Sequence, residues 1–151
     1  MLLALIVLLS LGGLADALYF TLAYYGRVKK ARWVPEILCA REGSSCVTVV
    51  QTPYARVFGV PNSLLGIIYY VLLIVWGLGS LWPNFWLVGW NRFLVFFSFL
   101  DFLILASIIT IGLGFYLIHA LRRKLHVDCP LCYTAHAINA ALLVLLVLLA
   151  R

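Results

Sequence analysis

The four cysteines of this chain occur as two close-spaced pairs, and a pair of neighbouring thiols is what disulfide exchange requires. Cys39 and Cys46 flank a polar segment after the first hydrophobic run, and Cys129 and Cys132 form a Cys-Pro-Leu-Cys at the start of the last one. One dithiol could pass electrons to the other, and the second could pass them to an acceptor dissolved in lipid. We therefore expect the two pairs to carry out redox chemistry together.

The Cys-Pro-Leu-Cys motif is predicted to open a helix, because proline is favoured at the first helical position. The N–H groups and dipole of a helix N-terminus stabilise an anion, so a thiol there ionises more readily. Cys129, Cys132, His136 and Asn139 follow one another at spacings of 3, 4 and 3 residues, which places them on one helical stripe. Residues 140–150 are only Ala, Leu and Val. This pattern predicts a pocket just below the membrane surface.

Two other interpretations of the cysteines stay open. Cys129 and Cys132 could form a stabilising disulfide or, with His136 and a loop cysteine, a metal site, because C-x2-C is common in zinc sites. The metal site is the weaker alternative, since His136 would lie a full turn into the bilayer with no carboxylate cluster nearby. A static bond between Cys39 and Cys46 would brace only a few residues, whereas a loop this short closes and reopens easily. Exchange is the favoured interpretation, with no metal.

The elements that position these residues are predicted to be membrane helices. The 151 residues are 66% hydrophobic and 11% charged, far from the composition of a soluble domain. Four apolar runs reach the length of about 20 residues that spans a bilayer, at residues 2–25, 63–82, 93–120 and 132–150. They lack the alternation of barrel strands. No Lys or Arg precedes the first run, which indicates a retained span. We expect an all-α membrane protein, a four-helix bundle in a single domain over residues 1–151.

The segment at residues 26–62 differs from the rest of the chain in being long and polar, and connections of this length are usually functional. Its second half, residues 52–61, mixes apolar and turn residues and is predicted to form a short interfacial helix. With four spans, this loop and the one at 121–128 share a membrane face, whereas the termini and the turn at 83–92 share the other. Both cysteine pairs are therefore predicted on the same face.

The positive charges are distributed unequally between the two faces. The opposite face has only Arg92 and Arg151. The cysteine face has nine of the eleven Lys and Arg residues, namely Arg27, Lys29, Lys30, Arg32, Arg41, Arg56, Arg122, Arg123 and Lys124. Cytoplasmic loops carry the excess of positive charge in membrane proteins. This bias predicts a multi-pass protein of the cell membrane with its cysteines on the cytoplasmic side.

Taken together, the motifs resemble the vitamin K epoxide reductase family. The resemblance rests on the loop cysteine pair, on Asn62-Ser63-Leu64-Leu65-Gly66 entering the second run, and on Cys-Pro-Leu-Cys followed by Tyr133-Thr134-Ala135-His136-Ala137-Ile138-Asn139. It covers essentially the whole chain. The order of the pairs is similar to that family and differs from the DsbB proteins, whose Cys-x-x-Cys comes early. The likeness is closest to the prokaryotic branch, which oxidises thiols and reduces quinones as the DsbB proteins do.

The resemblance implies a membrane thiol:quinone oxidoreductase that generates disulfide bonds. Cys132 would face the quinone and form a charge-transfer or covalent adduct with it. Cys129 would exchange with Cys46, and Cys39 would take electrons from a reduced thioredoxin-like partner, of the DsbA or PDI kind. No thioredoxin domain is fused to this sequence, so that partner would act in trans. The remaining partners would be membrane lipid and the quinone, with no nucleic acid.

The resemblance also implies a site for a quinone of the ubiquinone or menaquinone type, formed by Asn62, Ser63, His136 and Asn139. Asn62 would donate a hydrogen bond to a quinone carbonyl. The vertebrate enzymes have Tyr at the position of His136, which argues against the vitamin K epoxide reaction and leaves quinone reduction. An imidazole there would hydrogen-bond the quinone or supply its proton. The usual prokaryotic relative has its cysteines outside, whereas some archaeal relatives look inverted, as the charges of this chain predict.

Two carboxylates, Asp16 and Asp101, fall within the predicted spans. An ionised Asp in lipid costs several kcal/mol, so such groups are usually paired, protonated or functional. Asp16 would lie roughly 14 Å below the loop end of its helix, too deep for contact with a thiol. We expect a protonated Asp16 hydrogen-bonded between helices, in preference to a proton relay. The alternative function for the whole chain is a non-catalytic membrane protein with structural disulfides or a metal site.

Overall fold

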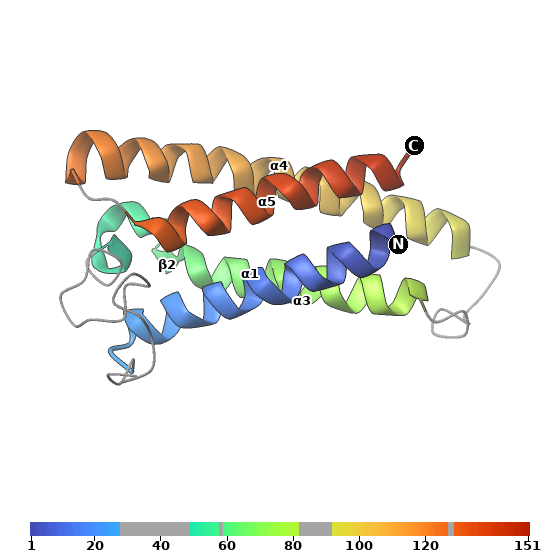
Figure 1. Cartoon of the computed structure of the whole chain (residues 1–151), viewed down its shortest axis with the longest axis horizontal. Helices are drawn as coiled ribbons and strands as arrows, with labels where there is room; N and C mark the ends of the chain where they lie inside the picture. Colours follow the sequence, from blue (N-terminus) through green and yellow to red (C-terminus); the bar gives the residue numbers. More distant parts are fainter. Residues whose placement is uncertain (28–48, 58, 82–91, 127–128) are drawn as a thin grey trace.

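The computed structural model describes residues 1–27, 49–57, 59–81, 92–126 and 129–151, without the side chains of 92–98 and 125. In this part of the chain four long helices lie along one another (Figure 1): α1 (Leu2–Tyr24), α3 (Asn62–Leu81), α4 (Arg92–Ala120) and α5 (Pro130–Leu149). Each contains a segment long and apolar enough to cross a membrane. The predicted all-helical fold with four spans is confirmed, and the helix ends differ from the predicted runs by at most two residues.

The end of α1 is set by a glycine. Gly26 has a φ of 65°, a left-handed conformation that glycine adopts without a steric penalty. The backbone N–H of Gly26 donates to the carbonyl of Ala23, and that of Arg27 donates to the carbonyl of Leu22. These two bonds form a Schellman motif, which satisfies carbonyls that the helix leaves open. The chain therefore leaves the apolar helix at the point where its polar segment begins.

Beyond α4 the structure differs from the prediction of a loop at residues 121–128. The helix continues as one turn of π-helix, η3 (Leu121–Leu125), and ends at His126. Leu121 is fully buried, so its side chain anchors this extra turn to the bundle. The basic side chains of the turn lie over aromatic rings, Arg122 over Tyr133 at 5.5 Å and Lys124 over Tyr54 at 5.6 Å. Burial and cation–π contacts thus extend the helix past its apolar run.

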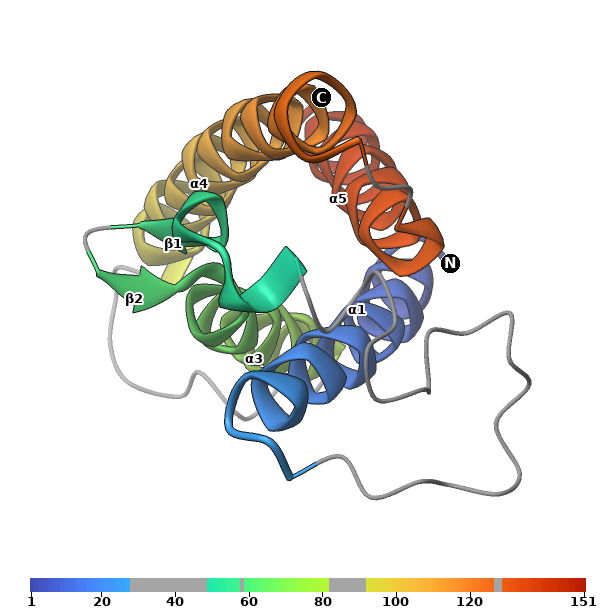
Figure 2. The ribbon, with the colours of Figure 1, turned by 90° about the vertical axis from the view of Figure 1, so that its left-hand side faces the viewer.

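The segment before α3 contains the predicted short helix and an additional hairpin. A short helical segment at residues 49–51 is followed by a 3₁₀ turn, η2 (Pro53–Ala55). The antiparallel strands β1 (Arg56–Val57) and β2 (Val60–Pro61) then lead directly into α3. Figure 2 shows these elements at one end of the bundle, with the hairpin at the edge beside α3 and α4. The hairpin was not predicted.

The four helices do not pack equally. Helix α1 contacts both α3 and α5, and α5 contacts α4. The α1–α3 contact is close because of glycines, as is common between membrane helices: a Cβ on Gly77 would lie 2.7 Å from Val7, and one on Gly13 would overlap the ring of Tyr70. In the described residues α3 and α4 have no backbone contact of comparable extent. The side of the bundle between α3 and α4 is therefore the most open.

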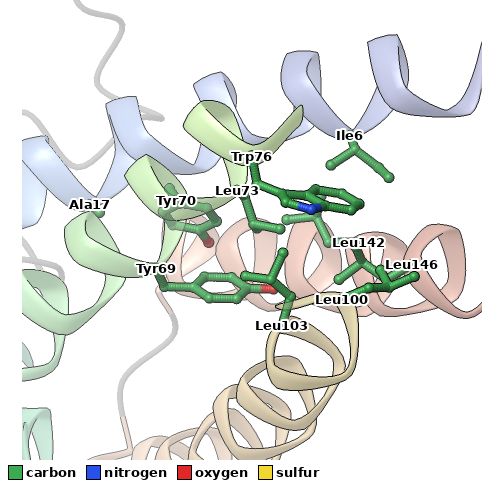
Figure 3. Close-up of a cluster of buried hydrophobic side chains, with 10 residues drawn as sticks. All are labelled: Ile6, Ala17, Tyr69, Tyr70, Leu73, Trp76, Leu100, Leu103, Leu142 and Leu146. Atoms are coloured by element: carbon green, nitrogen blue, oxygen red, sulfur yellow. The ribbon is translucent and has the colours of Figure 1, made fainter. Parts of the chain in front are cut away.

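The half of the bundle that lies away from Cys129 is filled by apolar side chains. Figure 3 shows this cluster, in which Trp76 of α3 lies among residues of all four helices. Its most deeply buried members are Ile6, Leu73, Trp76, Leu100, Leu103, Leu142 and Leu146. Close packing of this half stabilises the bundle. Space for a ligand within the described bundle is therefore expected in the half that carries Cys129 and Cys132.

Candidate active site

Cys129 and Cys132 are joined by a disulfide at the N-terminus of α5, with their Cα atoms 5.3 Å apart. Cys129 is the N-cap residue, and its sulfur accepts a hydrogen bond of 3.3 Å from the backbone N–H of Cys132. Pro130 occupies the first helical position. The prediction that this motif opens a helix is confirmed. The same N–H groups would stabilise a thiolate once the disulfide is reduced.

The disulfide is covered by apolar side chains. Cys129 has no exposed surface and Cys132 is 4% exposed. The cover comes from three parts of the chain and consists of Phe20, Val49, Val50, Leu117 and Leu121. The other predicted redox residues, Cys39 and Cys46, lie outside the described residues. In the sequence they fall between α1 and α3, and the C-terminal end of α1 and the N-terminal end of α3 lie at the same end of the bundle as the start of α5 (Figure 1).

A cavity of about 360 Å³ extends from the disulfide into the bundle. Four residues predicted to bind a cofactor, Asn62, Ser63, His136 and Asn139, all line it together with Cys132. The structure thus brings the N-terminus of α3 to the polar stripe of α5. The rest of the lining is mainly apolar and comes from all four helices and from Val49, Val50 and Ala55. A mostly apolar pocket with a few polar groups is typical of a small-molecule site.

The imidazole of His136 is an unusual feature of this cavity. Both ring nitrogens are buried, and neither has a hydrogen-bond partner within the described part of the chain. Buried polar atoms in proteins almost always have a partner. The ring lies against Gly114 of α4, where an added Cβ would be 2.5 Å from Nδ1. Gly114, which is not among the predicted site residues, therefore makes room for a side chain that is available to a polar ligand.

The inner end of the cavity carries two tyrosine hydroxyls. Tyr70 donates a hydrogen bond of 2.7 Å to Oδ1 of Asn139, which leaves the amide N–H groups of Asn139 available as donors. The hydroxyl of Tyr69 lies 2.7 Å from Ser107 of α4. Because Ser107 donates its own proton to the carbonyl of Leu103, Tyr69 is the donor in that pair. Neither tyrosine is among the predicted cofactor-binding residues, and the only signal for them in the sequence is their position two turns after Asn62.

One side of the cavity opens toward the surroundings of the bundle. Leu65 of α3 and Phe102, Leu105 and Ile109 of α4 line it, and all four side chains are also exposed. In a bundle that spans a membrane, this surface faces lipid hydrocarbon. A lipid-soluble ring with polar oxygens, such as a quinone, fits this combination: an apolar entrance, unpaired donors inside and a disulfide at one end.

The two membrane carboxylates have different surroundings. Asp16 lines the cavity from α1, beside Ala17 and Phe20. Its carboxyl was expected to hydrogen-bond to a neighbouring helix, but it makes no such bond to any residue whose position is described. Asp101 of α4 is exposed and does not line the cavity. Within the described ranges, no three His, Cys, Asp or Glu side chains lie close enough together to hold a metal ion.

These features define a multi-pass membrane protein with a disulfide beside a pocket open to lipid. The chain belongs to the vitamin K epoxide reductase family, which matches it over residues 4–147. The resemblance seen in the motifs is thereby confirmed. This is a family of quinone-reducing thiol-disulfide oxidoreductases, and it suggests a thioredoxin-like redox partner. Membership implies that the chain is a thiol oxidoreductase. A comparison with curated proteins gave no match.

Proposed function

We propose that this protein oxidises the dithiol of a thioredoxin-like partner and passes the electrons to a membrane quinone. The electrons would travel from the partner to Cys39–Cys46, then to Cys129–Cys132, and then to the quinone. The observation that carries this proposal is the position of the Cys129–Cys132 disulfide, at one end of a lipid-accessible cavity that contains unpaired polar groups. A disulfide that served only as a staple would not need such a cavity.

The geometry supports different roles for the two cysteines of α5. Cys132 lines the cavity and Cys129 does not. We therefore assign Cys132 to the quinone side and Cys129 to exchange with the loop pair. The residues that would hold the quinone are His136 and Asn139, with Asn62 and Ser63 nearer the membrane surface. When bound, the quinone would accept two electrons and two protons.

The position of Val49 supports exchange between Cys129 and Cys46. Val49 is packed in the same apolar cluster as Cys129. It follows Cys46 by three residues in the sequence, and three residues span at most about 11 Å. The length of the chain therefore allows Cys46 to reach Cys129, as the proposed exchange requires. Movement of Val49 and Val50 away from the Cys129–Cys132 disulfide would open it to attack by the Cys46 thiol.

The function is tested with the purified protein in lipid vesicles that contain a quinone. A reduced thioredoxin-like protein is added, and quinone absorbance is followed together with the number of free thiols. We expect one quinone to be reduced for each disulfide formed in the partner. The non-catalytic alternative predicts no absorbance change, together with metal that stays bound after purification without a chelator.

Replacing His136 with Phe is expected to weaken quinone binding. An unmade buried hydrogen bond costs about 1–3 kcal/mol, which corresponds to roughly a 5- to 150-fold increase in the quinone KM. His136→Tyr is the matched control, since it also changes the ring but keeps a donor, and it should bind the quinone within a few-fold of the unchanged protein. Equal quinone KM values for the Phe and Tyr variants would show that no hydrogen bond from this position holds the ring.

We also propose that the cysteine face is cytoplasmic. Five basic residues at the described part of that end, Arg27, Arg56, Arg122, Arg123 and Lys124, support the charge bias noted above. On intact cells, a membrane-impermeant thiol reagent should leave Cys39 unlabelled after treatment with a permeant reductant. Permeabilised cells should show labelling, and Cys39→Ser supplies the background. Rapid labelling on intact cells would establish the opposite orientation.

A further inference from the structure

Asp16 lies at the inner end of the cavity, level with its polar floor. At 1.5 Å per residue, it is about 12 Å below the end of α1 at Tyr24, and Tyr70 is about 12 Å below the start of α3 at Asn62. Asn139 is about 14 Å below the start of α5, whereas Cys132 is only about 3 Å below it. The cavity therefore connects two levels, with the reactive sulfur near the surface and the carboxyl deep inside.

Few groups at this inner level can release a proton. Tyr70 already donates its hydroxyl proton to Asn139, and Tyr69 donates to Ser107. An amide such as Asn139 is not an acid at physiological pH. Asp16 lines the cavity, and its carboxyl makes no hydrogen bond within the described residues. An ionised carboxylate is unfavourable inside a membrane bundle, so the neutral form, which carries a proton, is favoured.

We propose that Asp16 is the proton donor to the quinone oxygen that reaches the inner end of the cavity. This inference rests on the proposed function. Oxidation of the Cys129–Cys132 dithiol to the disulfide releases two electrons and two protons, and reduction of the quinone to the quinol takes up both. The thiol protons are released near the surface, about 9 Å above the level of Asp16. One thiol proton passes to the outer quinone oxygen and Asp16 gives its proton to the inner oxygen, which completes the quinol. The second thiol proton is released to water at the surface, and Asp16 is reprotonated by water that enters the cavity after the quinol leaves.

The first test measures one turnover of purified protein. Cys129–Cys132 is reduced with a small dithiol, the dithiol is removed, and a short-chain quinone is added while quinone absorbance and thiols are followed. General acid catalysis typically contributes 10²–10⁴-fold, so Asp16→Asn should slow quinone reduction by on the order of 100-fold. Asp16→Glu, which keeps the acid, should restore most of the rate. Asp101→Asn is the matched control, because it removes a carboxyl of another helix outside the cavity, and it should react at the unchanged rate.

The second test separates a proton donor from a residue that only shapes the cavity. Infrared difference spectra recorded on quinone reduction should show a change in a carboxylic acid C=O band, and this change should be missing in Asp16→Asn. In the unchanged protein the rate of quinone reduction should decline at high pH, where Asp16 loses its proton. This decline should be missing in the same variant. Tyr19 on its own helix and Tyr70 on α3 interact electrostatically with Asp16. The other ionisable groups that line the same cavity are Tyr69 on α3 and His136 and the Cys132 thiol on α5, and the lining residues of α4 include none. Recording both profiles in a His136→Phe background removes the imidazole from the comparison.

The possible outcomes are distinct. A slow Asp16→Asn variant with no carboxyl band and no high-pH decline supports the proposal. An Asp16→Asn variant that reacts at full speed, or a slow one that keeps the band and the pH profile, overturns it. An unchanged protein that reduces no quinone at all overturns the proposed function instead, and the two failures are therefore distinguishable.

Discussion

Replacing either Cys129 or Cys132 with serine is expected to abolish quinone reduction by a reduced partner. A disulfide carries two electrons, and a single remaining thiol cannot form one within α5. Serine is a suitable replacement because it is a favoured N-cap residue and should keep the helix start at position 129 intact. The measurement is the quinone absorbance change in vesicles, which should fall to background in both variants. Ala137→Ser, an exposed change on the same helix, should keep full activity.

The same two variants distinguish catalysis from bracing. If the disulfide served only to stabilise the bundle, both variants would unfold at lower temperature and no protein, changed or unchanged, would reduce quinone. Normal quinone reduction by either serine variant would contradict the proposed electron path. Thermal unfolding of the purified variants should be recorded beside the activity, so that loss of folding is not mistaken for loss of chemistry.

Serine at Cys39 or Cys46 is expected to give the second large effect, which depends on the source of electrons. Quinone reduction driven by a protein partner should be lost in both variants, because the partner would no longer have a disulfide to reduce. A single turnover of protein whose Cys129–Cys132 pair has been reduced chemically should proceed at the unchanged rate. The measurement is the ratio of these two rates.

Two changes should trap different intermediates. A partner with its second cysteine changed to serine should accumulate a mixed disulfide with Cys39 of the unchanged protein, because its single thiol opens Cys39–Cys46 and no second thiol resolves the bond. Cys39→Ser should accumulate a disulfide between Cys46 and Cys129, because the Cys46 thiol opens Cys129–Cys132 and releases the Cys132 thiol. Non-reducing electrophoresis and mass spectrometry of the peptides would identify each. If the loop variants oxidised the protein partner as fast as the unchanged protein, direct exchange with Cys129–Cys132 would replace the proposed relay.

The helices could be predicted because membrane spans depend on length and composition, which are local properties. The stripe of Cys129, Cys132, His136 and Asn139 could be predicted for a similar reason, since residues three and four apart share a helix face. The extra turn at Leu121–Leu125 could not, because it depends on the burial of Leu121 against other elements. The hairpin at residues 56–61 had only turn residues as its signal.

The surroundings of Asp16 show the limit of local patterns most clearly. Helix α1 is apolar on every side, so its hydrophobic pattern does not indicate which face is turned inward. The carboxyl was therefore expected between two helices, not in a cavity. The fit of Gly114 against His136 and the bond from Tyr70 to Asn139 likewise depend on how far one helix is shifted along another. Such longitudinal offsets are set by the packed bundle as a whole.

The apolar cover over the Cys129–Cys132 bond has a consequence for the cell. Phe20, Val49, Val50, Leu117 and Leu121 shield the sulfurs from the aqueous phase, so reduction of the disulfide by dissolved glutathione and other small thiols should be slow. Under the proposed function, a protein that displaces Val49 and Val50 would deliver electrons faster than these small thiols, and the electrons would leave to a quinone in the bilayer. The cover would thereby keep the soluble thiols of the cell from reacting freely with the quinones of its membrane.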